Sequence, residues 1–182
     1  MEIQEQASRD PIPATREKDG TVVVSQPDRF GELEEGGYGE RQDKVLRLKD
    51  FEALYLLYSK KMTLKEKGRD VGFEELAKAN QSKVKDSWTK FIIYRDLRSR
   101  GYVVKDGFGF GTDLRVYERG DFPAKAAKFV IFALDEGTEK SLGDLRDSVK
   151  QIVRMGKEAI VAVIERRGEV IYYRVTKASF RK

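Results

Sequence analysis

The feature that most constrains this chain is a change in the spacing of its apolar residues at Gly101. Before this glycine, Val84, Trp88 and Phe91 recur at the spacing of an amphipathic helix. After it, the segment 112–117 alternates between apolar and polar side chains, which is typical of a half-buried strand. The sequence therefore predicts a long helix that ends at Gly101 and leads directly into a β-sheet.

The rest of the C-terminal half continues this pattern. We expect strands at 102–104, 112–117, 128–134, 159–164 and 169–175, with turns at 105–107 and 166–168 and an amphipathic helix over 142–153. The continuous apolar strand 128–134 should be covered on both faces. Residues 81–182 are therefore predicted to form one domain, a mixed sheet flanked by helices.

The N-terminal half is predicted to be a smaller α/β domain over residues 1–80. Residues 1–20 are polar and read as a flexible arm, so that the first strand is expected at 21–24. A helix should follow Asp50, and a shorter one should cover 73–79. The segment 31–44 is rich in Gly and Glu and is predicted to be an exposed loop, long enough to indicate a functional role. The predicted fold class is thus α/β (α+β), in two domains.

The composition limits which ligands and cross-links the chain can provide. The chain contains no Cys and no His, which excludes disulfides, thiolate ligands and imidazole ligands. The acidic residues form no cation-binding loop pattern, so we predict neither a metal nor another cofactor. Charged residues make up 37% of the chain, a profile typical of thermophiles.

Charge and hydropathy bear on partners and location. The net charge is only +5, so nucleic-acid binding would require the basic residues to cluster. The longest apolar runs are too short to span a bilayer, and the sequence opens with no secretory leader pattern. We therefore expect a cytoplasmic location.

Several motifs identify a resemblance to a known family. The motifs are Tyr94–Arg98, Arg100–Lys105, Gly107–Tyr117, Ala126–Phe129, Lys157 and Gly168–Tyr173. Together they resemble the catalytic domain of the archaeal tRNA-splicing endonucleases (tRNA-intron endonucleases), from about residue 88 to 175. Glu52–Leu57 resembles the N-terminal domain of that family, but less closely.

The resemblance implies cleavage of precursor tRNA at a bulge–helix–bulge motif, without a metal. The ribose 2′-hydroxyl attacks the adjacent phosphate and leaves a 2′,3′-cyclic phosphate and a 5′-hydroxyl. By position, Tyr117 would be the base on the 2′-hydroxyl, and Lys157 would stabilise the charge on the phosphate oxygens. The family has His-(Ala/Ser)-Lys-(Phe/Tyr) where this chain has Ala126–Phe129, so Ala126 stands in place of the histidine that protonates the leaving oxygen.

Alanine cannot donate a proton, and loss of a general acid lowers a rate by about 10²- to 10⁴-fold. We therefore expect the chain to be nearly inactive as written. Ala126 has two interpretations, a naturally degenerate structural subunit or a deliberate His-to-Ala replacement. Retention of Tyr117 and Lys157 favours the replacement, because a degenerate subunit has no need of them.

RNA binding requires further residues. In the family, an arginine pair, or an aromatic substitute, sandwiches a flipped base, and the corresponding positions here are Lys150 and Tyr172. Tyr172 could stack on a base or serve only in packing. Basic residues recur every four positions on one helix face. They could contact RNA phosphates, or they could form an ordinary solvated face. That stripe consists of Arg146, Lys150 and Arg154.

Two more RNA-binding candidates come from position alone. Arg115 shares a strand face with Tyr117. Lys44 could bring the segment 31–44 to the RNA, although that segment could equally be a simple insertion.

The resemblance also implies an assembly. A chain with one N-terminal and one catalytic domain would act in a dimer of dimers, a heterotetramer with a different structural subunit, although a homotetramer is possible. The acidic loop 135–139 corresponds to a loop that docks on a neighbouring subunit in the family. Two alternatives to a catalytic subunit remain: a non-catalytic structural subunit of the same enzyme, and a general RNA-binding module.

Overall fold

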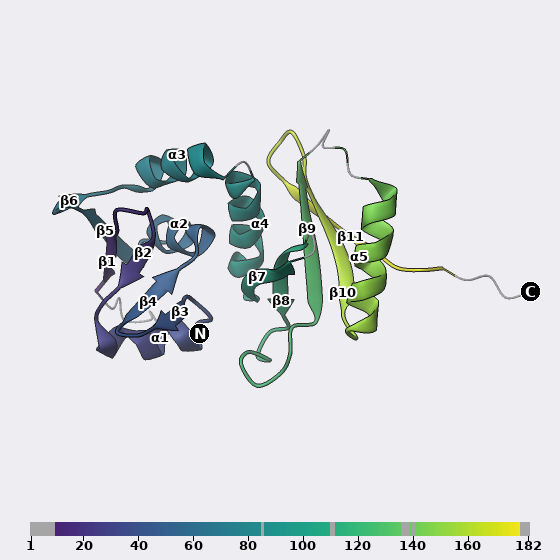
Figure 1. The fold of residues 1–182 in the computed structure, drawn as a ribbon, viewed down its shortest axis with the longest axis horizontal. Coiled ribbons are helices and arrows are strands. Elements are labelled where there is room, and N and C mark those ends of the chain that lie inside the picture. Colours follow the sequence, from purple (N-terminus) through teal and green to yellow (C-terminus); the bar gives the residue numbers. More distant parts are fainter. Residues whose placement is uncertain (1–9, 85, 110–111, 136–138, 140, 179–182) are drawn as a thin grey trace, which may run out of the picture.

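The protein is described by a computed structural model that covers residues 10–84, 86–109, 112–135, 139 and 141–178. Two β-sheets lie on either side of one long helix, α4 (Ser87–Ser99) (Figure 1). The six-stranded sheet has the order β3-β4-β2-β1-β5-β6, and the five-stranded sheet has the order β11-β10-β9-β8-β7. The predicted two-part α+β architecture is confirmed.

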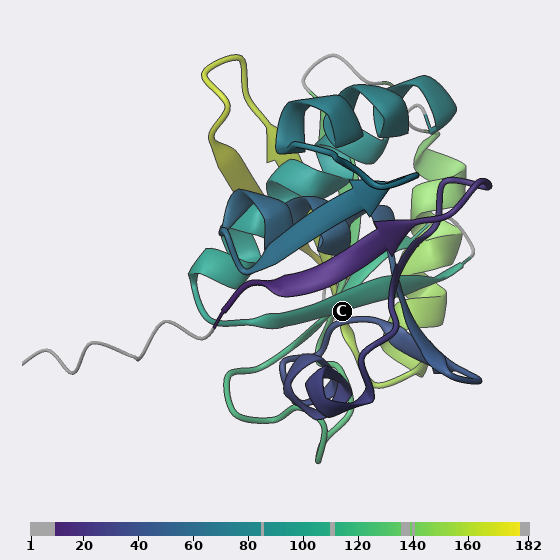
Figure 2. The same cartoon turned by 90° about the vertical axis from the view of Figure 1, so that its left-hand side faces the viewer.

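The N-terminal lobe is built on the six-stranded sheet. Its strands are β1 (Ile12–Arg16), β2 (Val22–Val24), β3 (Glu40–Gln42), β4 (Val45–Leu48), β5 (Met62–Glu66) and β6 (Arg69–Asp70). Strands β1 and β5 pair in parallel and lie side by side in Figure 2, while the other pairings are antiparallel. The helical elements are η1 (Pro27–Arg29), α1 (Phe30–Glu35), α2 (Asp50–Tyr58) and α3 (Phe73–Lys83).

Two predictions for this lobe were wrong. Residues 12–16 form β1 rather than part of an arm, because Ile12 and Ala14 are buried while β1 pairs with β2 and β5. The segment 31–44 is not an exposed loop, since it contains most of α1 and all of β3 and buries Leu33 and Tyr38. Each element is shorter than the window over which an apolar period becomes visible. The rest of the predicted arm, residues 1–9, lies outside the described residues.

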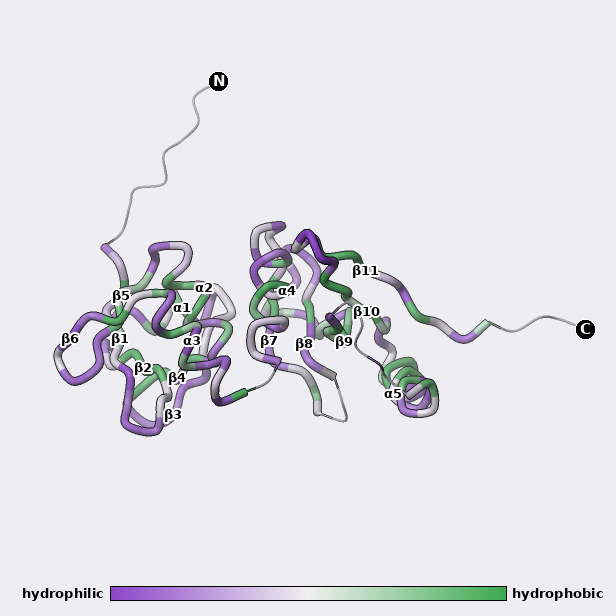
Figure 3. Tube along the Cα trace, turned by 90° about the horizontal axis from the view of Figure 1, so that it is seen from above, coloured by the Kyte–Doolittle hydropathy of each residue, from purple (hydrophilic) through white to green (hydrophobic). Residues whose placement is uncertain are grey.

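The C-terminal lobe has three layers. Its sheet consists of β7 (Val103–Gly109), β8 (Thr112–Tyr117), β9 (Phe129–Asp135), β10 (Glu158–Ile164) and β11 (Val170–Val175). Helix α4 covers one face and α5 (Leu142–Arg154) covers the other, as the view from above shows (Figure 3). Strands β9 and β10 are parallel and the remaining pairs are antiparallel. The predicted helices and most predicted strands of this half are confirmed.

One prediction in this lobe was wrong. Residues 105–107 do not form a turn but continue β7, with an irregularity in pairing between Asp106 and Gly109. The polar side chains that indicated a turn bind the other layers instead. Lys105 donates to the carbonyl oxygen of Gly39, and Asp106 accepts a hydrogen bond from Lys90.

The larger of two apolar clusters includes residues of α4 and of both lobes and so joins the lobes. Phe91, Ile93 and Tyr94 of this helix are fully buried. The ring of Tyr94 lies 4.8 Å from that of Phe51 and 5.6 Å from that of Tyr55, both on α2. A second apolar cluster fills the space between the five-stranded sheet and α5. Within the described part of the chain, no helix is long and apolar enough to cross a membrane.

Candidate active site

Three of the predicted site positions meet at one edge of the five-stranded sheet. Strand β8 ends at Tyr117, and the antiparallel β9 begins beside that end. Because β10 is parallel to β9, it begins at the same edge. Backbone hydrogen bonds of 2.9 Å join Lys128 to Val116 and Glu158 to Lys128. The strand order thus brings together Tyr117, the segment that holds Ala126, and Lys157.

Lys157 occupies the junction between α5 and β10. Its side-chain ammonium donates a hydrogen bond of 2.5 Å to the carbonyl oxygen of Ala127 and lies 5.4 Å from the ring centroid of Phe108. The backbone amide of Lys157 donates to Ile152 at the end of α5. The lysine is partly buried, and its bond to Ala127 holds the ammonium group beside position 126.

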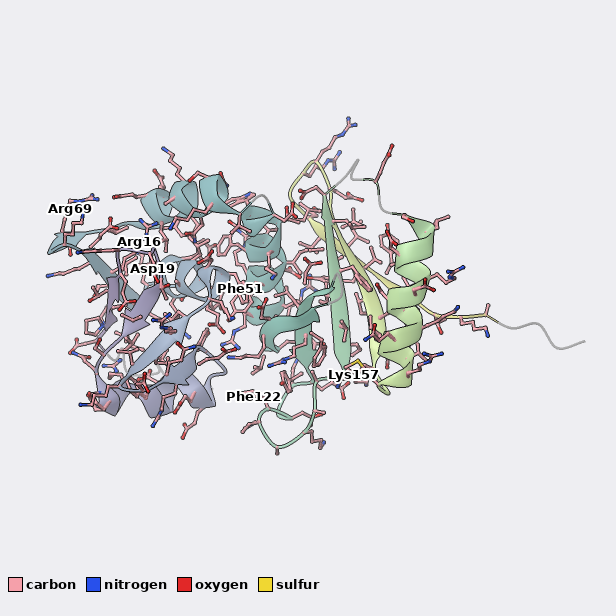
Figure 4. All side chains as sticks on the ribbon, viewed as in Figure 1. Arg16, Asp19, Phe51, Arg69, Phe122 and Lys157 are labelled. Carbon is pink, nitrogen blue, oxygen red and sulfur yellow. The ribbon has the colours of Figure 1, made fainter. Side chains whose placement is uncertain are left out.

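Position 126 lies in the connection between β8 and β9. Ala126 is exposed, whereas the next residue, Ala127, is buried. The connection is braced by two ion pairs of 2.7 Å, Lys125 with Asp121 and Lys128 with Glu118. Figure 4 places Phe122 in this connection and Lys157 at the same end of the sheet. A side chain at 126 would thus face solvent, and alanine offers no acidic proton there.

Tyr117 is the last residue of β8 and is partly buried. Its ring meets the ring of Phe122 edge to face, with centroids 5.0 Å apart and planes at 82°. A phenol and an ammonium group therefore both contact the connection between β8 and β9, the first at Phe122 and the second at Ala127. A phenol can transfer a proton, and an ammonium can stabilise a developing anion.

Arg115 lies near the same group of residues. Its guanidinium carbon is 5.2 Å from the ring centroid of Phe108, the ring that Lys157 also approaches. Among the described residues, the buried Nε atom of Arg115 has no hydrogen-bond partner. Sequence reasoning missed Phe108 and Phe122 as parts of the site. An aromatic residue between Gly107 and Gly109 was the available signal for the first.

The other predicted RNA-binding residues lie on other elements. Arg146 and Lys150 are exposed on α5, at 2.9 Å and 3.8 Å from the carboxylate of Asp147. The hydrogen bond from Arg146 lowers the pKa of Asp147. Lys44 is exposed in the turn between β3 and β4 and so belongs to the other sheet.

Tyr172, on β11, is bound within the chain. Its hydroxyl donates a hydrogen bond of 2.7 Å to Asp96 of α4, which also accepts one from Arg100. Burial, together with this bond, raises the pKa of Tyr172 above its ordinary value. The ring remains partly exposed. Most of the predicted acidic loop 135–139, namely residues 136–138, lies outside the described residues.

Comparison with known proteins gives one consistent result. Residues 14–77 match the N-terminal domain of the tRNA intron endonucleases, and residues 87–172 match their catalytic C-terminal domain. A tRNA-splicing endonuclease of Methanococcus vannielii is 30% identical over 163 residues, which cover 89% of this chain and 92% of the relative. That of Pyrococcus horikoshii is 32% identical over 144 residues, covering 79% and 83%.

A third relative differs in length. The tRNA-splicing endonuclease of Methanosarcina mazei is 32% identical over 162 residues, which cover 88% of this chain but only 45% of that longer protein. The N-terminal and catalytic family domains are both matched, one after the other along the chain. The first two relatives are aligned over 92% and 83% of their length. The chain belongs to the tRNA intron endonuclease family.

Proposed function

We propose that this chain is a catalytic-type subunit of a tRNA-splicing endonuclease that cleaves precursor tRNA at bulge–helix–bulge junctions and is inactivated by Ala126. The observation that carries the proposal is the meeting of Tyr117, position 126 and Lys157 at one sheet edge, in a chain of this family. Residues 1–80 and 81–182 would serve as its N-terminal and catalytic domains.

In the proposed reaction, Tyr117 accepts the proton of the ribose 2′-hydroxyl. The oxygen then forms a bond to the adjacent phosphorus, and the bond from phosphorus to the 5′-oxygen breaks. Lys157 stabilises the negative charge on the phosphate oxygens during this exchange. The departing 5′-oxygen must receive a proton, which histidine at 126 would supply and alanine cannot. The nucleophile belongs to the RNA, so the reaction needs no metal.

Binding of the RNA would use residues beyond this edge. Arg115 is the best placed, because it approaches the same aromatic ring as Lys157. Arg146 and Lys150 would contact phosphates from α5, in competition with Asp147. Lys44 would act from the N-terminal lobe. Tyr172 would offer only its ring to a base, since its hydroxyl is bound to Asp96.

We further propose a dimer of dimers with a structural subunit, with a homotetramer as the simpler form. Two other functions remain: this chain is itself the structural subunit, or it is a general RNA-binding module. The retained Tyr117 and Lys157 favour the catalytic subunit over the first. The matched catalytic domain favours it over the second.

The test is cleavage of bulge–helix–bulge RNA by this chain and by its Ala126→His variant, each with and without a partner subunit. With the partner present, we expect the Ala126→His variant to cut and to leave a 2′,3′-cyclic phosphate, and the chain with Ala126 not to cut. Binding without cleavage by both proteins would identify a structural subunit. Equal affinity for this RNA and for a plain duplex would identify a general RNA-binding module.

A further inference from the structure

The segment Gly36–Gly39 of the N-terminal lobe is fixed against the C-terminal lobe. Arg98 of α4 donates a hydrogen bond of 2.9 Å to the carbonyl oxygen of Gly36, and Lys105 of β7 donates one of 2.9 Å to that of Gly39. The backbone amide of Gly39 donates to the buried carboxylate of Glu52 at 3.0 Å. Bonds at both ends of the segment therefore hold its backbone in place.

Gly37, inside this segment, lies close to the C-terminal lobe. Its φ of +74° is in the left-handed region, which favours glycine. A β-carbon added there would lie 2.4 Å from a methyl carbon of Val103 and 3.5 Å from a ring carbon of Phe122. The approach to Val103 is closer than real β-carbons show, so a side chain at 37 would have to displace Val103 and would also reach the ring of Phe122.

Both neighbours of Gly37 also adjoin Tyr117. Val103 is the direct pairing partner of Tyr117 across β7 and β8. Phe122 meets the ring of Tyr117 edge to face at 5.0 Å, the arrangement that aromatic pairs prefer. Gly37 thus lies beside the two residues that adjoin Tyr117, one strand residue and one aromatic ring.

We propose that Phe122, supported by Gly37, is a positioning residue that fixes the orientation of the Tyr117 phenol. The inference rests on the proposed function, in which that phenol accepts the proton of the 2′-hydroxyl. A partly exposed tyrosine at the end of a strand otherwise has more than one staggered orientation to adopt. A misplacement of about 1 Å can lower a rate by about 10²-fold. The segment Gly36–Gly39 would therefore act on the reaction from the N-terminal lobe without contacting the RNA.

The first experiment uses the Ala126→His chain as the active reference and measures single-turnover cleavage and RNA affinity separately. Phe122→Leu keeps an apolar side chain and removes the ring, so we expect about 10- to 100-fold slower cleavage with unchanged affinity. Phe122→Tyr keeps the ring and should cut within about twofold of the reference. Cleavage by Phe122→Leu at the reference rate would overturn the proposal.

The second experiment tests the support from Gly37 with a matched glycine. Gly37→Ala meets both a positive φ and the methyl of Val103, whereas Gly68→Ala has a φ of +82° and open space around it. Both variants carry the backbone strain, and only the first pushes on the neighbours of Tyr117. We expect Gly37→Ala to cleave more slowly than the reference, and Gly68→Ala to cleave at the reference rate. Equal cleavage rates for the two variants, each measured on folded protein, would count against a supporting role of Gly37.

A third measurement does not depend on cleavage. The chain with Ala126 is labelled with 3-fluorotyrosine, and its fluorine NMR spectrum is recorded. The resonance of Tyr117 is assigned by its loss in Tyr117→Phe. We expect this signal to move in Phe122→Leu and to stay in place in Gly68→Ala. If it moves although Ala126→His fails to cut, the contact stands and the proposed function alone fails. A Tyr117 signal unchanged by Phe122→Leu would refute the positioning role itself.

Discussion

The side-chain nitrogen of Lys157 lies 2.5 Å from the carbonyl oxygen of Ala127, the residue directly after the exposed Ala126. This bond ties the start of β10 to the loop that follows β8. One amine therefore anchors the loop and provides a positive charge beside position 126. In the proposed reaction these two roles are linked, because the cation and the proton donor would keep a fixed separation.

Lys157→Ala, made in the Ala126→His chain, should lower the single-turnover cleavage rate by about 10²- to 10³-fold, as expected when a charge-stabilising group is removed. Amide hydrogen exchange in the segment 126–128 should also become faster, because the bond to Ala127 is lost. Lys78→Ala removes an exposed lysine of α3, to which no role in the reaction or in RNA binding is assigned, and is the matched control. A rate for Lys157→Ala equal to that of the control would exclude the role in charge stabilisation.

Tyr117→Phe in the same Ala126→His chain removes the hydroxyl and leaves the ring in contact with Phe122. Cleavage should become slower by about 10²- to 10⁴-fold, the usual contribution of a general base. The melting temperature should hardly change. Tyr58→Phe, at an exposed position of α2, provides the control. Undiminished cleavage by Tyr117→Phe would mean that another group accepts the proton.

Lys105→Met should strongly destabilise the fold. The Lys105 ammonium lies 3.4 Å from the carboxylate of Glu52, whose side chain is 0% exposed. Loss of one partner leaves a buried carboxylate, at a cost of about 3–5 kcal/mol in the free energy of unfolding. Arg69→Met breaks an exposed pair with Glu75 and should leave stability nearly unchanged. Urea unfolding of the two variants measures the contrast, and similar midpoints would show that the buried pair is dispensable.

Tyr172→Phe should change how stability depends on alkaline pH. Burial and the bond to Asp96 raise the pKa of Tyr172, so the folded protein keeps this proton at pH values where the unfolded chain loses it. Stability from this group is full below the ordinary tyrosine pKa of about 10 and falls as the pH rises above it.

Urea unfolding at pH 8 and at pH 11 tests this expectation. The original chain should lose more stability between the two values than Tyr172→Phe does. Burial also raises the pKa values of Tyr38 and Tyr94. Tyr172→Phe should therefore still lose some stability between pH 8 and pH 11. An identical loss in both proteins would show that Tyr172 titrates normally.

Local pattern in the sequence was sufficient for the longer elements. The helical spacing that ends at Gly101 predicted α4, and the alternation over 112–117 predicted β8 with its observed bounds. The period followed burial in β8, where Leu114 and Val116 are buried, and in the later turns of α4, where Phe91 and Tyr94 are buried. It did not mark burial at the start of the helix, because Val84 precedes α4 and both Val84 and Trp88 are exposed. Short elements such as α1 and β1 offer too few residues for such a period and were missed.

The motifs at Tyr117, Ala126 and Lys157, and with them the family, could also be identified from the sequence. What only the tertiary structure decided is how distant residues meet. Strand order placed Lys157 against Ala127, and packing between the lobes placed Gly37 against Phe122 and turned Lys105 inward. Apolar periodicity reports which face of an element is buried, but the partner that covers that face is fixed by the packing of the whole chain.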